Sequence, residues 1–204
     1  GMGETKKKPY YKSDACEVSR MENETGDGIS TAFRVFPGIY LLHSDFHMQE
    51  CPTVKSDDAD ILWLDFCREG RVEWEISKDK YVYLESGNYV IDIRAGRKFT
   101  LHFPMGHYHG ISLRIHMKEA NQALADFIKG VNIDVYTIRD KFLSEGQPFI
   151  TKGNEIIHHI FEEIEQVPWD SSGEYYKIKV LEILFQLKNM ERPKERSEER
   201  RVGK

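Results

Sequence analysis

The middle of the chain alternates apolar and polar residues with a period of two, which is typical of half-buried strands. In Arg71–Ile76 the apolar side chains Val72, Trp74 and Ile76 share one face, and charged side chains share the other. Runs of this kind recur about every ten residues between turn residues. The pattern predicts strands at Ile39–His47, Ile61–Arg68, Val72–Ile76, Lys80–Leu84, Asn88–Ile93, Lys98–Phe103 and Gly110–His116. Short strands in one run favour a sandwich or barrel.

Beyond Met117 the spacing of apolar residues changes to about 3.6, which indicates helices. The predicted helices are Lys118–Lys129, Asp134–Leu143, Asn154–Val167 and Gly173–Met190. The third begins with a candidate Asn cap, and the last is apolar over a wide arc, so it needs more than one packing partner. Strands followed by helices predict an α+β fold.

These patterns divide the chain into four segments. Residues 1–31 are charged and turn-prone without sustained periodicity, and they read as a flexible leader. Residues 32–117 form the β-barrel, and residues 118–190 form the helical subdomain. Residues 191–204 carry charge without an apolar stripe, as a linker or tail does.

Composition narrows the class of protein. Of 204 residues 40% are hydrophobic and 31% are charged, a balance typical of a soluble globular domain. The net charge of -5 argues against a nucleic-acid-binding module. Three cysteines, Cys16, Cys51 and Cys67, show no CxxC spacing and read as reduced thiols. No segment approaches the roughly 20 apolar residues of a membrane span, so we expect a cytoplasmic protein without a membrane contact.

The segment from His102 to His109 contains the main candidate for metal chemistry. In a strand, His107 and His109 share a face and could bind one metal, with a third ligand from His102, His43, His47 or a carboxylate. A pair of histidines is a weak signal, however, and Pro104 and Gly106 place a turn before it. The alternative is that these histidines bind backbone or solvent at the barrel mouth.

Other catalytic patterns are missing from the sequence. Cys51 and Cys67 lie in no recognised nucleophile context, and there is no glycine-rich phosphate loop. We therefore expect no enzymatic activity, no cofactor and no metal.

Aromatic residues concentrate in the strand region, where inward-pointing rings would line a pocket for a small molecule. The candidate ligand-binding residues are Trp63, Trp74, Tyr89, His107 and His109. The period of two does not say which face of each strand points inward.

Three segments resemble the sensor domains of AraC-family transcription regulators, especially the pyochelin-regulator-like branch. The first is Phe66–Trp74 followed by Tyr83–Asn88, the second is Phe103–Ile111, and the third is Lys179–Phe185. Together they cover about residues 33 to 190 in the family's order.

The resemblance implies a cupin-like antiparallel barrel that binds an unknown small-molecule effector. It also implies a C-terminal helical subdomain that forms a homodimer, for which we name Ile178, Leu181, Leu184 and Phe185. No helix-turn-helix sequence follows Met190, so DNA contact would need a domain absent from this chain. The alternatives are a metal-dependent cupin enzyme that uses His107 and His109, and a dimerisation domain with a vestigial barrel.

Overall fold

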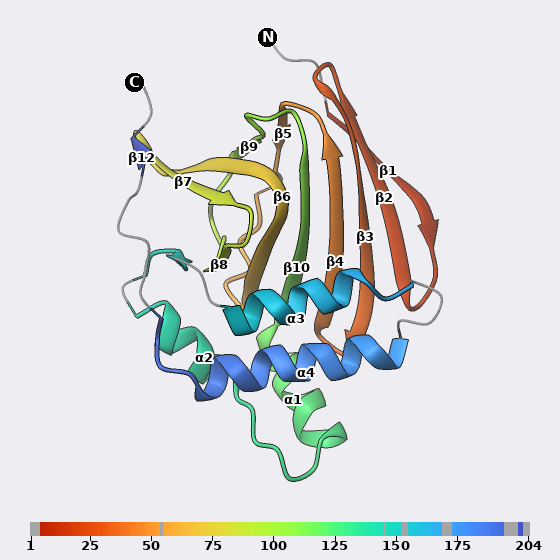
Figure 1. Ribbon diagram of the computed structural model, residues 1–204, viewed down its shortest axis with the longest axis vertical. Helices are drawn as coiled ribbons and strands as arrows, with labels where there is room; N and C mark the ends of the chain where they lie inside the picture. The colour runs from red at the N-terminus through yellow and green to blue at the C-terminus, as the bar shows by residue number, and fades with distance from the viewer. Residues whose placement is uncertain are drawn as a thin grey trace.

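The structure is a computed structural model that describes residues 5–53, 55–144, 146–151, 155–168, 173–193 and 200–201. A curled antiparallel sheet comes first in the chain, and helices that cover one of its faces follow (Figure 1). The predicted α+β fold class is confirmed.

The sheet holds twelve strands within the described residues. Their bounds are β1 Lys6–Lys12, β2 Cys16–Asn23, β3 Gly26–Phe36, β4 Ile39–His47, β5 Glu50–Pro52, β6 Ile61–Ser77, β7 Lys80–Glu85, β8 Tyr89–Asp92, β9 Thr100–His102, β10 Tyr108–His116, β11 Phe149–Ile150 and β12 Arg200–Arg201. The main path runs β1-β2-β3-β4-β10-β6-β7-β12, with β8 and β9 also paired to β6. Strand β10, which comes late in the sequence, therefore lies between β4 and β6 in the middle of the sheet.

The two strands predicted at Ile61–Arg68 and Val72–Ile76 are one long strand, β6. Its first half pairs with β8 and β10, and its second half pairs with β7. Gly70 lies at the change of partner with φ +84°, and a Cβ there would lie 2.3 Å from the His107 carbonyl oxygen. The turn signal at this glycine is therefore a bend within one strand.

The prediction of a flexible leader is wrong for the described residues 5–31. Strands β1, β2 and the start of β3 occupy this segment and pair in register with one another. The charged linker or tail over residues 191–204 stays a prediction, and in its described part Arg200 and Arg201 pair with β7.

The helices match the predicted positions closely. Their bounds are α1 Met117–Phe127, α2 Val135–Phe142, α3 Glu155–Glu165 and α4 Gly173–Asn189. Asp134 caps α2 by accepting a hydrogen bond from the Tyr136 backbone N–H at 2.9 Å. The expected cap Asn154 lies outside the described residues.

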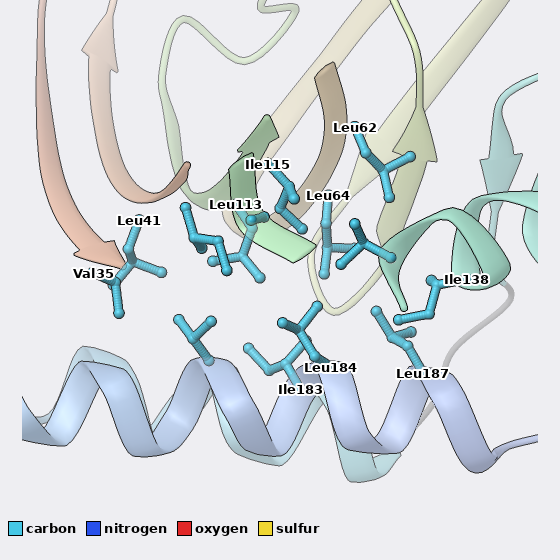
Figure 2. Close-up of a cluster of buried hydrophobic side chains, with 14 of the residues drawn as sticks. Val35, Leu41, Leu62, Leu64, Leu113, Ile115, Ile138, Ile183, Leu184 and Leu187 are labelled. Carbon is cyan, nitrogen blue, oxygen red and sulfur yellow. The ribbon is translucent and has the colours of Figure 1, made fainter. Parts of the chain in front are cut away.

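The main core lies between the sheet and the helices. Figure 2 shows Leu113 and Ile115 of β10 directed toward Ile183 and Leu184 of α4. Phe66 of β6 stacks on Phe161 of α3, with ring centroids 4.7 Å apart. The face of the sheet that is covered by the helices is therefore mostly apolar and closely packed.

The wide apolar arc of helix α4 is divided between a face that packs on the core and a face that is exposed. Leu184 is fully buried against the sheet, and Leu181 packs at the edge of the core, whereas Ile178 and Phe185 are 59% and 47% exposed. Of the four residues proposed for dimerisation, Leu184 is corrected, since a fully buried side chain has no surface to offer a partner.

We expect Leu184→Ala to lower the free energy of unfolding by about 3 kcal/mol, because it leaves a cavity in the main core. Urea denaturation measures the change. The control is Lys188→Ala on an exposed position of the same helix, which should cost less than about 0.5 kcal/mol because it leaves no cavity. Equal losses for the two variants would contradict the orientation of α4.

Candidate functional site

The curl of the sheet encloses a cavity of about 390 Å³ on the face opposite the helices. Strands from both halves of the sheet and the loop between β8 and β9 contribute to its wall. The wall consists of Lys7, Glu17, Ser19, Met21, Ser30, Ala32, Leu42, Ser44, Phe46, Cys51, Pro52, Thr53, Ser56, Trp63, Asp65, Val72, Trp74, Leu84, Arg94, Arg97, Phe99, Leu101, Tyr108, Ser112 and Arg114. The volume lies in the range of pockets that hold small molecules.

Strand alternation separates the cavity from the main core. On β10, Ser112 and Arg114 face the cavity, whereas Ile111, Leu113 and Ile115 face the helices. The strands β4 and β6 divide their side chains in the same way. Successive side chains of a strand point to opposite faces, so each central strand builds the cavity wall and the core together.

Aromatic rings form much of the cavity's apolar wall. Trp74 is only 2% exposed, and its Nε1 is buried without a hydrogen-bond partner in the part of the chain that the structure describes. Phe46 stacks on Tyr108 at 6.5 Å between ring centroids, and burial raises the pKa of the Tyr108 phenol well above its usual range. The phenol is therefore neutral at physiological pH.

One partly buried ion pair lies in the cavity wall. Arg94 pairs with Asp65, and Ser112 Oγ donates a hydrogen bond to the second carboxylate oxygen at 2.6 Å. The Arg94 guanidinium also lies over the Trp63 ring, 4.5 Å from its centroid. These contacts hold the guanidinium in one position.

A second arginine is tied to a buried carboxylate. Arg97 Nη2 donates to Asp92 Oδ2 at 2.5 Å and to the Ile93 carbonyl oxygen at 2.7 Å. Burial raises the pKa of Asp92, and Arg94 and Arg97 offset part of that rise. The Arg97 charge is therefore largely committed to its partner.

The third arginine, Arg114, has no carboxylate within ion-pairing distance among the residues described. Its guanidinium lies 4.6 Å from the Tyr40 ring centroid and 5.9 Å from that of Trp63. Its Nε is buried without a hydrogen-bond partner, and burial lowers the pKa of the guanidinium, with Tyr40 and Glu17 opposing that shift. Arg114 is thus a desolvated cation at the cavity.

Two of the five predicted ligand-binding residues, Trp63 and Trp74, lie in the cavity wall. The other three do not. Tyr89 is buried in the main core, His107 is in an exposed turn with Nδ1 3.3 Å from the Met105 carbonyl oxygen, and His109 faces the helices.

Sequence reasoning missed the three arginines. Ser112 and Arg114 alternate with apolar residues in β10, so they read as the solvent-facing side of a strand. Only the curl of the sheet turns that side inward.

His109 belongs to a polar cluster between the sheet and the helices. Its Nε2 lies 3.5 Å from Oε1 of Glu165, at the end of α3, and Nδ1 of His43 lies 3.7 Å from the same oxygen. Arg68 Nη1 donates to Glu165 Oε2 at 2.8 Å, and His43 Nε2 lies 3.0 Å from the Tyr176 hydroxyl of α4. One carboxylate therefore joins β4, β6 and β10 to the helices.

Within the described ranges, no group of three or more His, Cys, Asp or Glu side chains is arranged to hold a metal ion. His109 is turned toward Glu165, and His107 is not part of that contact. Burial, with the nearby Glu85 and Glu69, raises the pKa of the Cys67 thiol to about 12, so this thiol stays protonated at neutral pH.

Neither a protein-family model nor a curated protein matches the chain. Among solved structures it is similar to the AraC-like transcriptional activator CuxR, with 12% identity and a TM-score of 0.49 over 86% of this chain and 60% of that one. It is also similar to an apo ToxT variant from Vibrio cholerae, with 14% identity and a TM-score of 0.44 over 74% of this chain and 56% of that one.

A third similar structure is the Cupin_2 domain of an XRE family regulator from Enterobacter cloacae, with 14% identity and a TM-score of 0.30 over 54% of this chain and 95% of that one. The chain thus spans somewhat over half the length of CuxR and ToxT. At these scores the similarities carry no argument about function, which has to come from the cavity. Separately, none of the described helices has the length and apolar character needed to cross a membrane.

We expect Glu165→Gln to lower the free energy of unfolding by about 2 kcal/mol at pH 7, because Arg68 and the two histidines lose a buried charged acceptor. Burial raises the pKa of Glu165, but the His43 hydrogen bond and the nearby His109, His43 and Arg68 charges outweigh it and leave the pKa lowered. A carboxyl with a lowered folded pKa stabilises the fold above its unfolded pKa, and that stabilisation disappears as the pH falls through the folded pKa. The difference between variant and wild type should therefore shrink below about pH 4.

Urea denaturation from pH 7 to pH 3 measures this difference. Glu162→Gln on the same helix is the control, since Glu162 is 36% exposed and pairs with the surface residue His158. It should change stability by less than about 0.5 kcal/mol. A loss in Glu165→Gln that stays constant over the whole pH range would contradict a role for the ionised carboxylate.

Proposed function

We propose that this chain is the effector-binding domain of a transcription regulator of the AraC type. The observation that carries the proposal is the cavity of about 390 Å³, whose wall combines aromatic rings with the guanidinium of Arg114. Among the described residues, no carboxylate lies within ion-pairing distance of Arg114. A charge beside an apolar cavity is costly without a counter-charge, so Arg114 marks a place where a ligand would bind.

The function we propose is sensing, without catalysis. The competing proposal, a metal-dependent cupin enzyme, needs His107 and His109 together with a third ligand, but the two histidines face different surroundings. The protonated Cys67 thiol supports the same choice. In this proposal, DNA contact would come from a separate domain. Because a transcription regulator of this type acts where the DNA is, we also propose a cytoplasmic location.

The proposed signal passes from the cavity to the helices through shared strands. Leu42 and Ser44 line the cavity, and His43 between them contacts Glu165 and Tyr176 on the helical side. A ligand shifts an equilibrium only by its differential affinity for the two states. A ligand that moves β4 or β10 would do so by changing the geometry around Glu165, which positions the end of α3.

We further propose that the domain forms a homodimer through the outer face of α4. Ile178 and Phe185 lie seven positions apart, two turns of the helix, and both are largely exposed. Exposed apolar pairs on one helix face are typical of partner contacts. The resemblance to the pyochelin-regulator-like branch places siderophores among the candidate effectors.

Filling the cavity should abolish effector binding without unfolding the domain. Ala32 lies in the cavity wall on β3, so Ala32→Phe would place a ring in the space of the ligand. We expect compounds in a metabolite library that raise the Tm of the wild type, measured by differential scanning fluorimetry, to leave the Tm of this variant unchanged.

Ala125→Phe is the matched control, since the same change on the exposed surface of α1 should leave every response intact. The sensor proposal is contradicted when no compound distinguishes Ala32→Phe from the wild type.

The dimer proposal is tested by Ile178→Asp combined with Phe185→Asp. We expect the double variant to be a folded monomer in native mass spectrometry, because two charges on the interface cannot be buried without partners. Ile156→Asp, on an exposed position of α3, is the control and should leave the mass unchanged. A double variant that stays dimeric would place the interface elsewhere.

A further inference from the structure

The charged side chains of the cavity wall include three guanidinium groups and the ammonium of Lys7, which can only donate hydrogen bonds. A ligand that pairs with one of these groups has to contribute acceptors. The Asp65 carboxylate of the same wall already accepts from Arg94 and Ser112.

The charges around the cavity leave one positive charge without a partner. Arg94 pairs with Asp65 and Arg97 pairs with Asp92, while Lys7 and Glu17 add one charge of each sign to the wall. These groups together with Arg114 sum to one net positive charge. Glu17 acts on Arg114 at longer range, but no carboxylate lies within ion-pairing distance of it among the described residues. A buried charge is stable only with a counter-charge or with strong hydrogen bonds, so the cavity fits a ligand with a single negative charge.

The position of Arg114 also indicates a flat ligand. Its guanidinium is held between the Tyr40 and Trp63 rings, and Trp63, Trp74, Phe99 and Tyr108 supply flat apolar surface to the wall or beside it. The volume of about 390 Å³ is at the small end of ligand pockets, which suits one or two fused rings better than a nucleotide or a long chain.

We propose that the cavity binds a small aromatic carboxylate, whose carboxylate pairs with Arg114 and whose ring packs on Trp63. The assignment deepens the proposed function and rests on it. A planar guanidinium binds a carboxylate through two parallel hydrogen bonds, and no carboxylate among the described residues makes this contact with Arg114.

Isothermal titration calorimetry with matched acids and amides tests the charge requirement. The probes are benzoate with benzamide and 2-naphthoate with 2-naphthamide, at pH 7 and constant ionic strength. In the wild type each acid should bind at least about tenfold more tightly than its amide, since a hydrogen-bonded ion pair contributes more than a neutral hydrogen bond. Cyclohexanecarboxylate should bind more weakly than benzoate, because it lacks the flat ring that packs on Trp63.

Arg114→Met keeps the apolar stem and removes the charge. We expect it to reduce the preference for acid over amide by about tenfold while amide binding changes little. The control is Arg139→Met on α2, because Arg139 also lies over a tyrosine ring, that of Tyr136 at 4.9 Å, but outside the cavity wall. Arg114→Lys is the second variant; it keeps the positive charge and should retain more of the preference for acid over amide than Arg114→Met does.

The outcomes separate this assignment from the proposed function. Amides that bind as tightly as acids to the wild type would overturn the aromatic carboxylate and leave the sensor function standing, whatever the variants do. Binding of no probe would also overturn it. The sensor function itself fails only when, in addition, no metabolite distinguishes Ala32→Phe from the wild type.

Discussion

The central strands β4, β6 and β10 have to bury both of their faces, and the rest of the structure depends on this. One face meets the helices and is almost wholly apolar, as Leu113 and Ile115 are. The other face lines the cavity and carries Ser112 and Arg114. Because side chains alternate, a slip of one residue would place Arg114 in the dry core and Leu113 in the cavity. The packing of the helices therefore also sets the register of the cavity wall.

A cavity lined by desolvated arginines is costly for a domain to keep. For two of the three guanidinium groups, ion pairs with Asp65 and Asp92 offset the desolvation. Ser112 donates a hydrogen bond to Asp65 in the first pair. Arg114 has aromatic rings beside it and no carboxylate within ion-pairing distance among the described residues. Burial lowers the pKa of its guanidinium, although Tyr40 and Glu17 oppose that shift. Packing alone would favour an apolar residue at this position. A cation that lowers the stability of the domain alone, and raises it when an anion pairs with the cation, is suited to recognise an anion.

The Glu165 cluster shows how a binding event could be transmitted through so closely packed a sheet. Arg68, His43 and His109 come from three neighbouring strands and converge on one carboxylate at the end of α3. His43 also reaches Tyr176 of α4, so both helices that pack on the sheet are connected to strands that line the cavity. Polar contacts of this kind change partners with small movements, whereas the surrounding apolar core has no alternative arrangement of similar energy.

The sequence by itself determined most of the secondary structure and the α+β class, because periods of two and 3.6 report directly on strands and helices. Ile39–His47 was predicted to the residue, and each helix was placed within a few residues. The strands β1 and β2 were missed, because β1 is rich in lysine and β2 carries polar residues such as Glu17 and Arg20 on both of its faces. Which face of each strand points inward was decided only by the tertiary structure. The curl of the sheet turned Arg114 inward and His109 toward the helices, because a period of two is unchanged when its faces are exchanged.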